Sequence, residues 1–148
     1  MDGHNASQIA DTHLILERQG GQVLMLVRAN TGYMDGMIGL PAGHVKPGEP
    51  ADAAIIREAK EEIGIVIDPD DLAFAHVMHR RTPCEDIARV SFFFTATRWA
   101  GDVVNAEPDK CAGLIWSDPV SLPGHTIGYI ADALAAFRAD QGFNACGW

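Results

Sequence analysis

The sequence lacks the features that would place it in a membrane or a secretory pathway. No stretch approaches the ~18 consecutive apolar residues that a membrane-spanning helix requires. The amino terminus has no basic region followed by an apolar run, which a secretory signal would show. These absences predict a cytoplasmic protein that has no membrane as a partner.

Cysteine is also scarce. Cys84, Cys111 and Cys146 are odd in number and widely spaced. This pattern matches neither a disulfide framework nor a zinc knuckle, both of which need paired cysteines at short, regular intervals. We therefore expect unpaired thiols in a reducing compartment.

Basic residues are outnumbered by acidic ones. The chain has 11 Lys plus Arg against 20 Asp plus Glu, a formal net charge of −9 at pH 7. A negative field of this size repels phosphate backbones, so a nucleic-acid polymer is not an expected partner. An anionic small molecule would need local neutralisation, for which a metal ion is suitable.

The rest of the composition is that of an ordinary folded domain. Hydrophobic residues make up 47% and charged residues 21% of the 148 residues. This length suits one core, and the chain contains no internal repeat, low-complexity tract or long Pro/Gly/Ser linker. We therefore predict a single domain over residues 1–148.

Strand-like and helical patterns alternate along the chain. In the segment 50–63, Ile55, Ala59 and Ile63 share one helical face, and Gly64 is placed to end the helix. The apolar run 90–94 predicts a buried central strand. The expected strands are 12–18, 22–28, 72–78, 88–99 and 114–116, with a second helix at 127–138. This interleaving predicts an α/β or α+β fold with a mixed sheet.

The helix 50–63 carries a second, acidic face. Glu58, Glu61 and Glu62 lie at i, i+3 and i+4, so their carboxylates converge, at a cost of about 0.2–0.5 kcal/mol for each like-charged pair. Clustered carboxylates are ligands that Mg²⁺ or Mn²⁺ prefers. A glutamate-rich helix face on its own is more often solvated surface, so the neighbouring residues decide between the two interpretations.

Those neighbours resemble the Nudix box, G-x5-E-x7-R-E-U-x-E-E-x-G-U. The matching residues are Gly43, Glu49, Arg57, Glu58, Ala59, Glu61, Glu62, Gly64 and Ile65. Ala59 is the one mild departure, being small where a bulkier aliphatic residue is frequent. Fixed identities at so many set spacings make a specific signal, and the lead-in at 40–44 is also similar to that of the family.

Membership in this family would imply a fold, a cofactor and a mechanism. The implied fold is an α/β/α sandwich around a mixed β-sheet. The implied cofactor is Mg²⁺, or Mn²⁺, held by Glu58, Glu61, Glu62 and the carbonyl of Gly43, and Arg57 would orient these glutamates through a salt bridge. The implied reaction is attack of a metal-activated water on a diphosphate without a covalent intermediate. The sequence leaves the general base unassigned.

The later segment 105–111, followed by Trp116, is similar to a segment of MutT-like nucleoside triphosphate pyrophosphatases. By this resemblance Glu107 would complete the metal site, and a (d)NTP or modified (d)NTP would be cut to a monophosphate and pyrophosphate. Two alternatives stay open: a Nudix enzyme acting on ADP-ribose or another nucleotide sugar, and a nucleotide sensor that does not hydrolyse its ligand. The complete set of box glutamates and the lack of an attached DNA-binding domain speak against a sensor.

Residues outside the box give weaker indications. Arg28 and His44 are candidate substrate-binding residues, since a guanidinium and an imidazole both donate hydrogen bonds to phosphate. Residues that could stack on a base are Tyr33, Met34, Trp99 and Trp116, although a tryptophan within an apolar strand, such as Trp116, is more often part of the core. The basic residues His76, His79, Arg80 and Arg81 are interpreted as a solvated strand end outside the site. A homodimer is compatible with the family, but no self-complementary patch is apparent, so the oligomeric state stays open.

Overall fold

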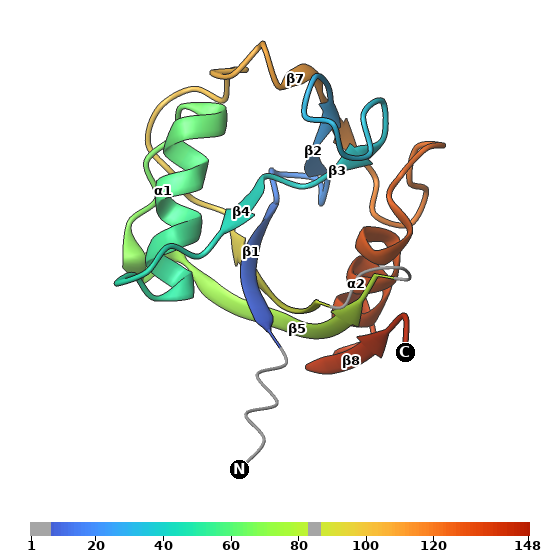
Figure 1. Cartoon of the computed structure of the whole chain (residues 1–148). Helices are drawn as coiled ribbons and strands as arrows, with labels where there is room; N and C mark the ends of the chain where they lie inside the picture. Colours follow the sequence, from blue (N-terminus) through green and yellow to red (C-terminus); the bar gives the residue numbers. More distant parts are fainter. Residues whose placement is uncertain (1–6, 83–86) are drawn as a thin grey trace.

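The computed structural model describes residues 7–82 and 87–148, in which the strands form two sheets (Figure 1). The five-stranded sheet has the order β4-β1-β6-β5-β8 and the three-stranded sheet the order β3-β2-β7. The strands are β1 (Gln8–Leu16), β2 (Val23–Arg28), β3 (Ile38–Gly39), β4 (Ala42–His44), β5 (Ala73–Arg81), β6 (Ala88–Ala96), β7 (Cys111–Ser117) and β8 (Phe143–Cys146). The helices are α1 (Ala51–Ile63), α2 (Gly128–Arg138) and a short 3₁₀ helix, η1 (Pro69–Asp71).

The larger sheet is mixed, as the sequence predicted. Strand β6 lies at its centre, parallel to β1 and antiparallel to β5. This is the strand that contains the apolar run 90–94, so the prediction of a buried central strand is confirmed. Strand β1 begins at Gln8, earlier than the predicted start at 12, because polar residues such as Gln8 and Asp11 extend the pairing with β6.

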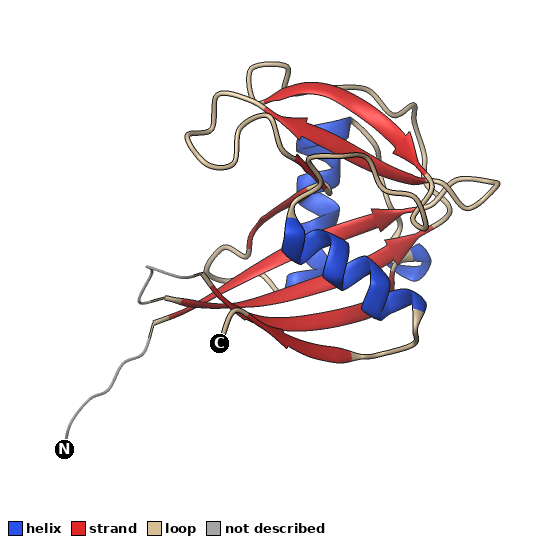
Figure 2. Ribbon diagram, turned by 90° about the vertical axis from the view of Figure 1, so that its right-hand side faces the viewer, coloured by secondary structure: helices blue, strands red, loops and turns tan. Residues whose placement is uncertain are grey.

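Successive residues of β1 point into two separate cores. Leu14 and Leu16 pack in the same cluster as Ile55 of α1, whereas Ile15, between them, packs in the same cluster as Ile130 of α2. Alternation of this kind places the two helices on opposite faces of the sheet, and Figures 1 and 2 show them on opposite sides. The predicted α/β/α sandwich is therefore confirmed.

Helix α1 follows the predicted pattern closely. Its buried residues are Ala54, Ile55, Ala59 and Ile63, which form one stripe on the sheet. Gly64 ends the helix in the left-handed conformation, with φ 73°, and donates its N–H to the carbonyl of Lys60. This firm stop fixes where the glutamate-bearing turns face.

Two features of the carboxyl-terminal half were not predicted. Strand β8 pairs in parallel with β5 at the edge of the sheet. Its four residues include an exposed phenylalanine and alternate only between exposed and partly buried positions, so no strand-like hydrophobic pattern marks it. The prediction of an exposed basic strand end is wrong for His76 and Arg80, which are 0% and 6% exposed, because α2 and β8 cover that end of β5.

The structure also bears on membrane-spanning segments and on the cysteines. Within the described residues, no helix is long and apolar enough to cross a membrane. Cys111 and Cys146 are free thiols, as expected. Cys84 lies outside the described residues.

The α1–sheet interface gives a direct test of this packing. Ile55 is completely buried, so Ile55→Ala removes packed methylenes and leaves a cavity, and should lower the free energy of unfolding by about 2–5 kcal/mol. Val66→Ala removes methyl groups at a position that is 51% exposed and should change it little. Urea titration monitored by circular dichroism measures both, and equal effects would contradict the assigned packing.

Candidate active site

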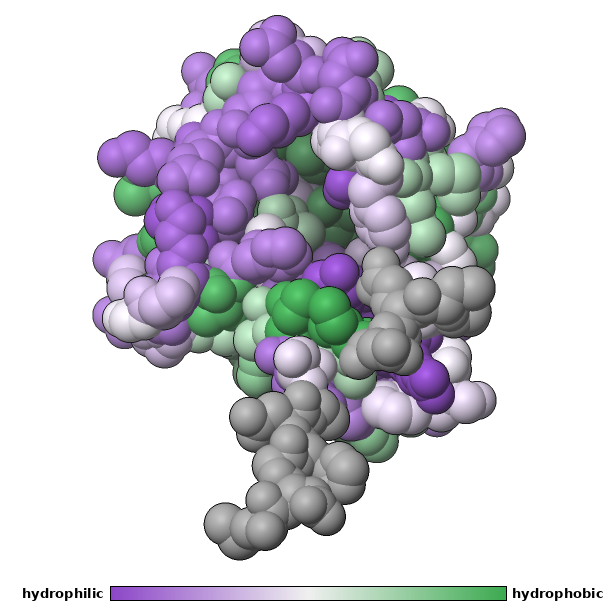
Figure 3. Space-filling view, in the orientation of Figure 1, coloured by the Kyte–Doolittle hydropathy of each residue, from purple (hydrophilic) through white to green (hydrophobic). Residues whose placement is uncertain are grey.

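A cavity of about 650 Å³ opens between helix α1 and the two sheets. Figure 3 shows a hollow in this face of the molecule, with hydrophilic residues around much of its rim. The cavity lies within the ~300–1,000 Å³ range typical of small-molecule sites. Its lining includes every residue that the sequence analysis assigned to catalysis, metal binding or phosphate binding: Arg28, Gly43, His44, Arg57, Glu58, Glu61, Glu62 and Glu107.

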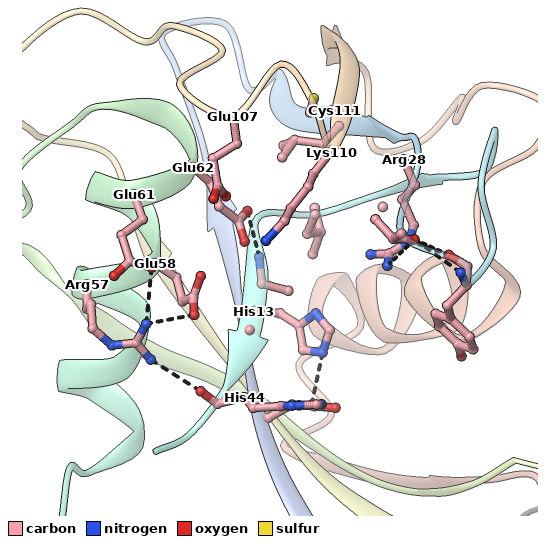
Figure 4. A pocket seen from close by; sticks show the side chains of 18 of the residues that line it. His13, Arg28, His44, Arg57, Glu58, Glu61, Glu62, Glu107, Lys110 and Cys111 are labelled. Atoms are coloured by element: carbon pink, nitrogen blue, oxygen red, sulfur yellow. Dashed lines mark hydrogen bonds and ion pairs between the residues drawn. The ribbon is translucent and has the colours of Figure 1, made fainter. Parts of the chain in front are cut away.

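Backbone contacts explain how Glu107 comes to lie beside α1. The loop that carries it is tied to the end of the helix, since Val104 N donates to Ile63 O and Ala106 N to Glu62 O, each at 3.0 Å. Figure 4 shows Glu62, Glu107 and Lys110 directed into the same space. The fold thus brings Glu107 next to the box glutamates, which are distant from it in sequence.

Arg57 is bonded to three glutamates. Its Nη1 donates to Glu58 Oε1 at 2.8 Å and to Glu61 Oε2 at 3.3 Å (Figure 4). Its Nη2 and Nε donate to the two oxygens of Glu49 at 2.6 and 3.1 Å. The predicted salt bridge between Arg57 and the glutamates is therefore present. A two-point contact of this kind fixes the planes of both groups.

Glu49 connects this arrangement to the loop before the helix. Besides binding Arg57, it accepts a hydrogen bond from the Lys46 N–H at 2.9 Å. The hydrogen bond from Arg57 and, to a smaller extent, that from Lys46 lower the pKa of Glu49 to about 2. The same contact with Glu49 raises the pKa of Arg57. Both groups are therefore charged at neutral pH and hold the loop to the helix.

Glu62 has the opposite electrostatic character. Its burial makes the largest contribution to raising its pKa well above the usual range, and the negative charges of Glu58 and Glu107 add to this effect. A hydrogen bond from the Ala42 N–H at 3.3 Å acts in the opposite direction but does not cancel it. Negative charge at this end of the cavity is thus incompletely compensated by the protein. A cation would compensate it.

The donor set fits a divalent cation that prefers oxygen. Glu58, Glu61, Glu62 and Glu107 all border one cavity, and a Cβ on residue 43 would overlap the Glu58 carboxylate. Only glycine therefore lets the β4 backbone approach this carboxylate. Within residues 7–82 and 87–148, no group of three or more His, Cys, Asp or Glu side chains is already gathered as metal ligands would be, and Arg57 holds Glu58 and Glu61 at present.

Arg28 and His44 border the cavity but have protein partners. Arg28 donates to the Tyr33 carbonyl at 2.9 Å and to Thr31 Oγ1 at 3.2 Å, and lies across the cavity from the glutamates in Figure 4. His44 Nε2 lies 3.3 Å from Arg89 Nη1. Their proposed contact with substrate stays a prediction.

Sequence reasoning missed several polar residues of the cavity lining, among them Asp11, His13, Lys110, Arg80 and Tyr129. Asp11 and His13 could have been noticed as ionisable residues at i and i+2, on one face of a largely apolar strand. Lys110 follows Glu107 in the segment already compared with MutT-like proteins. Arg80 and Tyr129 carry no local signal, since only the packing of α2 against β5 brings them together.

The four candidates for stacking on a base lie in different surroundings. Tyr33 borders the cavity and is exposed, whereas Met34, in the same loop, is exposed but is not part of the lining. Trp99 and Trp116 stack on each other, with ring centroids 6.4 Å apart, and pack against the core on the α1 side. The two tryptophans are therefore structural.

The Nudix class of protein is defined by an α/β/α sandwich in which one helix directs a regularly spaced set of glutamates toward a nucleotide-sized cavity. Accordingly, the NUDIX domain family model matches residues 7–135. The chain belongs to the NUDIX family. The prediction of one domain over residues 1–148 is not tested by this match and stays a prediction.

Proteins to which the chain is similar include MutT-like members of this family. An 8-oxo-dGTP diphosphatase of Escherichia coli (strain K12) is 25% identical over 88 residues, which are 60% of this chain and 65% of that protein. A MutT NUDIX hydrolase from Burkholderia pseudomallei has a similar structure, with a TM-score of 0.78 and 25% identity, over 87% of this chain and 97% of the other. An Ap4A hydrolase from C. elegans shares the fold, with a TM-score of 0.66 and 18% identity, over 89% and 96%. The MutT-like resemblance is therefore confirmed.

Proposed function

We propose that this protein hydrolyses a (d)NTP or a modified (d)NTP to a monophosphate and pyrophosphate, with Mg²⁺ or Mn²⁺ as cofactor. The observation that carries the proposal is the convergence of the three box glutamates and Glu107 on one cavity of about 650 Å³. A cavity of this size suits a nucleotide. The similarity to MutT-like proteins favours a triphosphate over other diphosphate compounds.

Each residue of the acidic end has a distinct part in this proposal. Glu58, Glu61, Glu62, Glu107 and the carbonyl of Gly43 would hold the cation, which when bound neutralises the diphosphate and lowers the pKa of a water molecule. Arg57, through its contacts with Glu49, Glu58 and Glu61, keeps the carboxylates in place. Its part is positioning, as for groups that orient metal ligands in other proteins.

Lysine and arginine side chains bordering the cavity supply positive charge to a chain whose net charge is −9. The Lys110 amine projects into the cavity beside the glutamates, and Arg28 faces it from the other side (Figure 4). Both groups donate hydrogen bonds that phosphate oxygens accept. We assign Lys110 to the phosphates of the substrate and Arg28 to substrate binding on the opposite side of the cavity, with His44 at the rim as a further donor.

Location and assembly are part of the same proposal. Free thiols at Cys111 and Cys146 suit a reducing cytoplasm. We propose a small-molecule nucleotide as the partner, without a nucleic-acid polymer or a membrane. The formation of a homodimer stays open.

The experiment that tests the proposal measures phosphate and pyrophosphate release, with Mg²⁺, from a panel of substrates. The panel contains the common (d)NTPs, oxidised and methylated analogues, ADP-ribose and diadenosine polyphosphates. Pyrophosphate release from one class of triphosphate is expected. Preferential cleavage of ADP-ribose would move the assignment to that substrate class, and tight nucleotide binding without hydrolysis of any compound would support a sensor.

The positioning part of Arg57 predicts a specific defect. Arg57→Lys keeps the charge but cannot make the two-point contact with Glu49 while also reaching Glu58 and Glu61. We expect kcat/KM to fall about 10–100-fold, with little change in the melting temperature. Arg138→Lys, on α2 and away from the cavity, is the matched control. Unchanged kcat/KM in Arg57→Lys would contradict the positioning part.

A further inference from the structure

Among the polar side chains that line the cavity, four contact one another: Asp11 and His13 of β1, Arg80 of β5 and Tyr129 of α2. We name this group the polar floor. Asp11, His13 and Arg80 are 5%, 3% and 6% exposed. Burial of charged groups at this depth is costly and is usually associated with a function or a tight pairing.

The members of the polar floor hold one another in fixed orientations. The two oxygens of Asp11 accept hydrogen bonds from His13 Nε2 and Arg80 Nη2, each at 3.0 Å. Arg80 lies over the ring of Tyr129, with its guanidinium carbon 3.8 Å from the ring centroid. His13 stacks on Phe93 at 4.6 Å and meets Tyr129 edge-on at 5.9 Å. These contacts leave the side chains little freedom.

The pairing with Asp11 indicates which ring nitrogen of His13 donates. Burial alone would raise the pKa of Asp11, but the hydrogen bond from His13 and the charge of Arg80 hold it well below its usual range. Asp11 is therefore a carboxylate, which only accepts hydrogen bonds, so His13 Nε2 must be the donor. In the neutral ring, Nδ1 is then an acceptor.

No donor within the described part of the chain forms a hydrogen bond with this acceptor. His13 Nδ1 is buried and has no hydrogen-bond partner there. His76 offers a comparison, since it is also fully buried near Phe93 but outside the cavity lining. Its Nδ1 lies 2.6 Å from the Gln141 carbonyl and its Nε2 bonds to Asn144. The unpaired nitrogen thus belongs to the histidine that borders the cavity.

Tyr129 adds a donor to the same surface. Burial raises the pKa of its hydroxyl to about 12, so the group keeps its hydrogen at neutral pH. Among the described residues, no hydrogen bond to this hydroxyl is found. The floor therefore combines an acceptor with a donor and carries compensating charges on Asp11 and Arg80. A neutral ligand edge with both N–H and acceptor groups complements such a surface, whereas a phosphate does not.

We propose that the polar floor binds the hydrogen-bonding edge of the substrate's nucleobase, and that His13 Nδ1 accepts a hydrogen bond from a base N–H. This inference rests on the proposed function, because it states which part of the nucleotide lies at this end of the cavity. The phosphates then lie at the glutamate end, beside Lys110. His13 is consequently a specificity-determining residue that disfavours bases without an N–H group.

The test removes first the donor, by changing the base, and then the acceptor, by substituting His13. The natural ligand is ATP or GTP, whichever is cleaved faster, and it is compared with purine riboside triphosphate, whose base has no N–H. If the enzyme prefers pyrimidines, the natural pyrimidine nucleotide is compared with 2-pyrimidinone riboside triphosphate. For the wild-type protein we expect kcat/KM to be at least about tenfold higher for the natural base, because the analogue leaves Nδ1 unpaired. In His13→Gln, whose amide keeps a donor toward Asp11 but lacks the Nδ1 acceptor, this ratio should fall toward one.

Two further variants separate recognition from folding. His13→Asn places an amide near the Nδ1 position and should retain part of the ratio. His76→Gln removes a buried histidine of the same core outside the cavity, and should lower the melting temperature while leaving the ratio at the wild-type value. A wild-type ratio near one, or an unchanged ratio in His13→Gln, would overturn the inference.

A binding measurement keeps the inference testable even if the proposed function fails. Absence of hydrolysis of every nucleotide would count against the enzyme activity alone. Calorimetric Kd values for the monophosphates of the same ligand pair then give the base ratio without turnover. The same loss of discrimination in His13→Gln is expected, and its absence would overturn the inference independently.

Discussion

Glu62→Gln should abolish most of the hydrolysis while leaving the fold intact. The substitution removes one ligand charge and almost no volume, at the partly buried glutamate that faces both Glu58 and Glu107. We expect kcat to fall by about 10² or more, as when one preorganised charge-stabilising group is lost from an active site. Pyrophosphate release under saturating substrate measures it, and Mn²⁺ binding followed by electron paramagnetic resonance should weaken in parallel.

The stability of the same variant tests its electrostatic environment. A carboxyl group whose pKa is raised by folding favours the protonated form, so its ionisation destabilises the fold as pH rises above the unfolded-state value. With chelator present at pH 7, Glu62→Gln should therefore melt at the same temperature as the wild-type protein or higher. Glu17→Gln, outside the cavity lining, controls for the loss of one negative charge. A variant that melts well below wild type, or one with full activity, would refute the assignment.

Gly43→Ala should have an effect of similar size for a steric reason. A Cβ at this position would overlap the carboxylate of Glu58 and come within 2.7 Å of its Cγ. Glu58 cannot simply move aside, because Arg57 binds it at 2.8 Å. We expect kcat/KM to drop by about 10²-fold, as when a catalytic group is displaced by about an ångström.

The matched control for this variant is Gly128→Ala. A Cβ added at position 128 would meet no heavy atom within 4 Å, and the residue begins helix α2, where alanine is well tolerated. Its kcat/KM should equal that of the wild-type protein. Normal activity in Gly43→Ala would show that β4 does not need its close approach to the glutamate.

The part of the site that lies within one continuous segment could be predicted from the sequence. Helical periodicity places Glu58, Glu61 and Glu62 on one face because their spacing is local, and Gly64 ends the helix because it adopts the left-handed conformation without strain. The box also implied the salt bridge of Arg57, which the structure confirms. Likewise, the apolar run 90–94 predicted the central strand, since a strand buried on both faces needs little alternation.

Contacts between distant segments could not be predicted in the same way. The position of Glu107 depends on two backbone hydrogen bonds from its loop to the end of α1; only a family resemblance pointed to it. Arg80 was interpreted as solvated because nothing in its own strand reveals that α2 will cover it with Tyr129. Strand β8 was missed because its pairing with β5, rather than its own pattern, makes it a strand.

The central claim is that the glutamate end of the cavity holds a divalent cation and hydrolyses a nucleoside triphosphate. Its most direct test is pyrophosphate release by protein stripped with EDTA, measured before and after Mg²⁺ is added back, on the best triphosphate of the panel. We predict no release from the stripped protein and full recovery with Mg²⁺ in the wild-type protein, but not in Glu62→Gln. Undiminished release with chelator in excess, or full recovery in the variant, would contradict the claim.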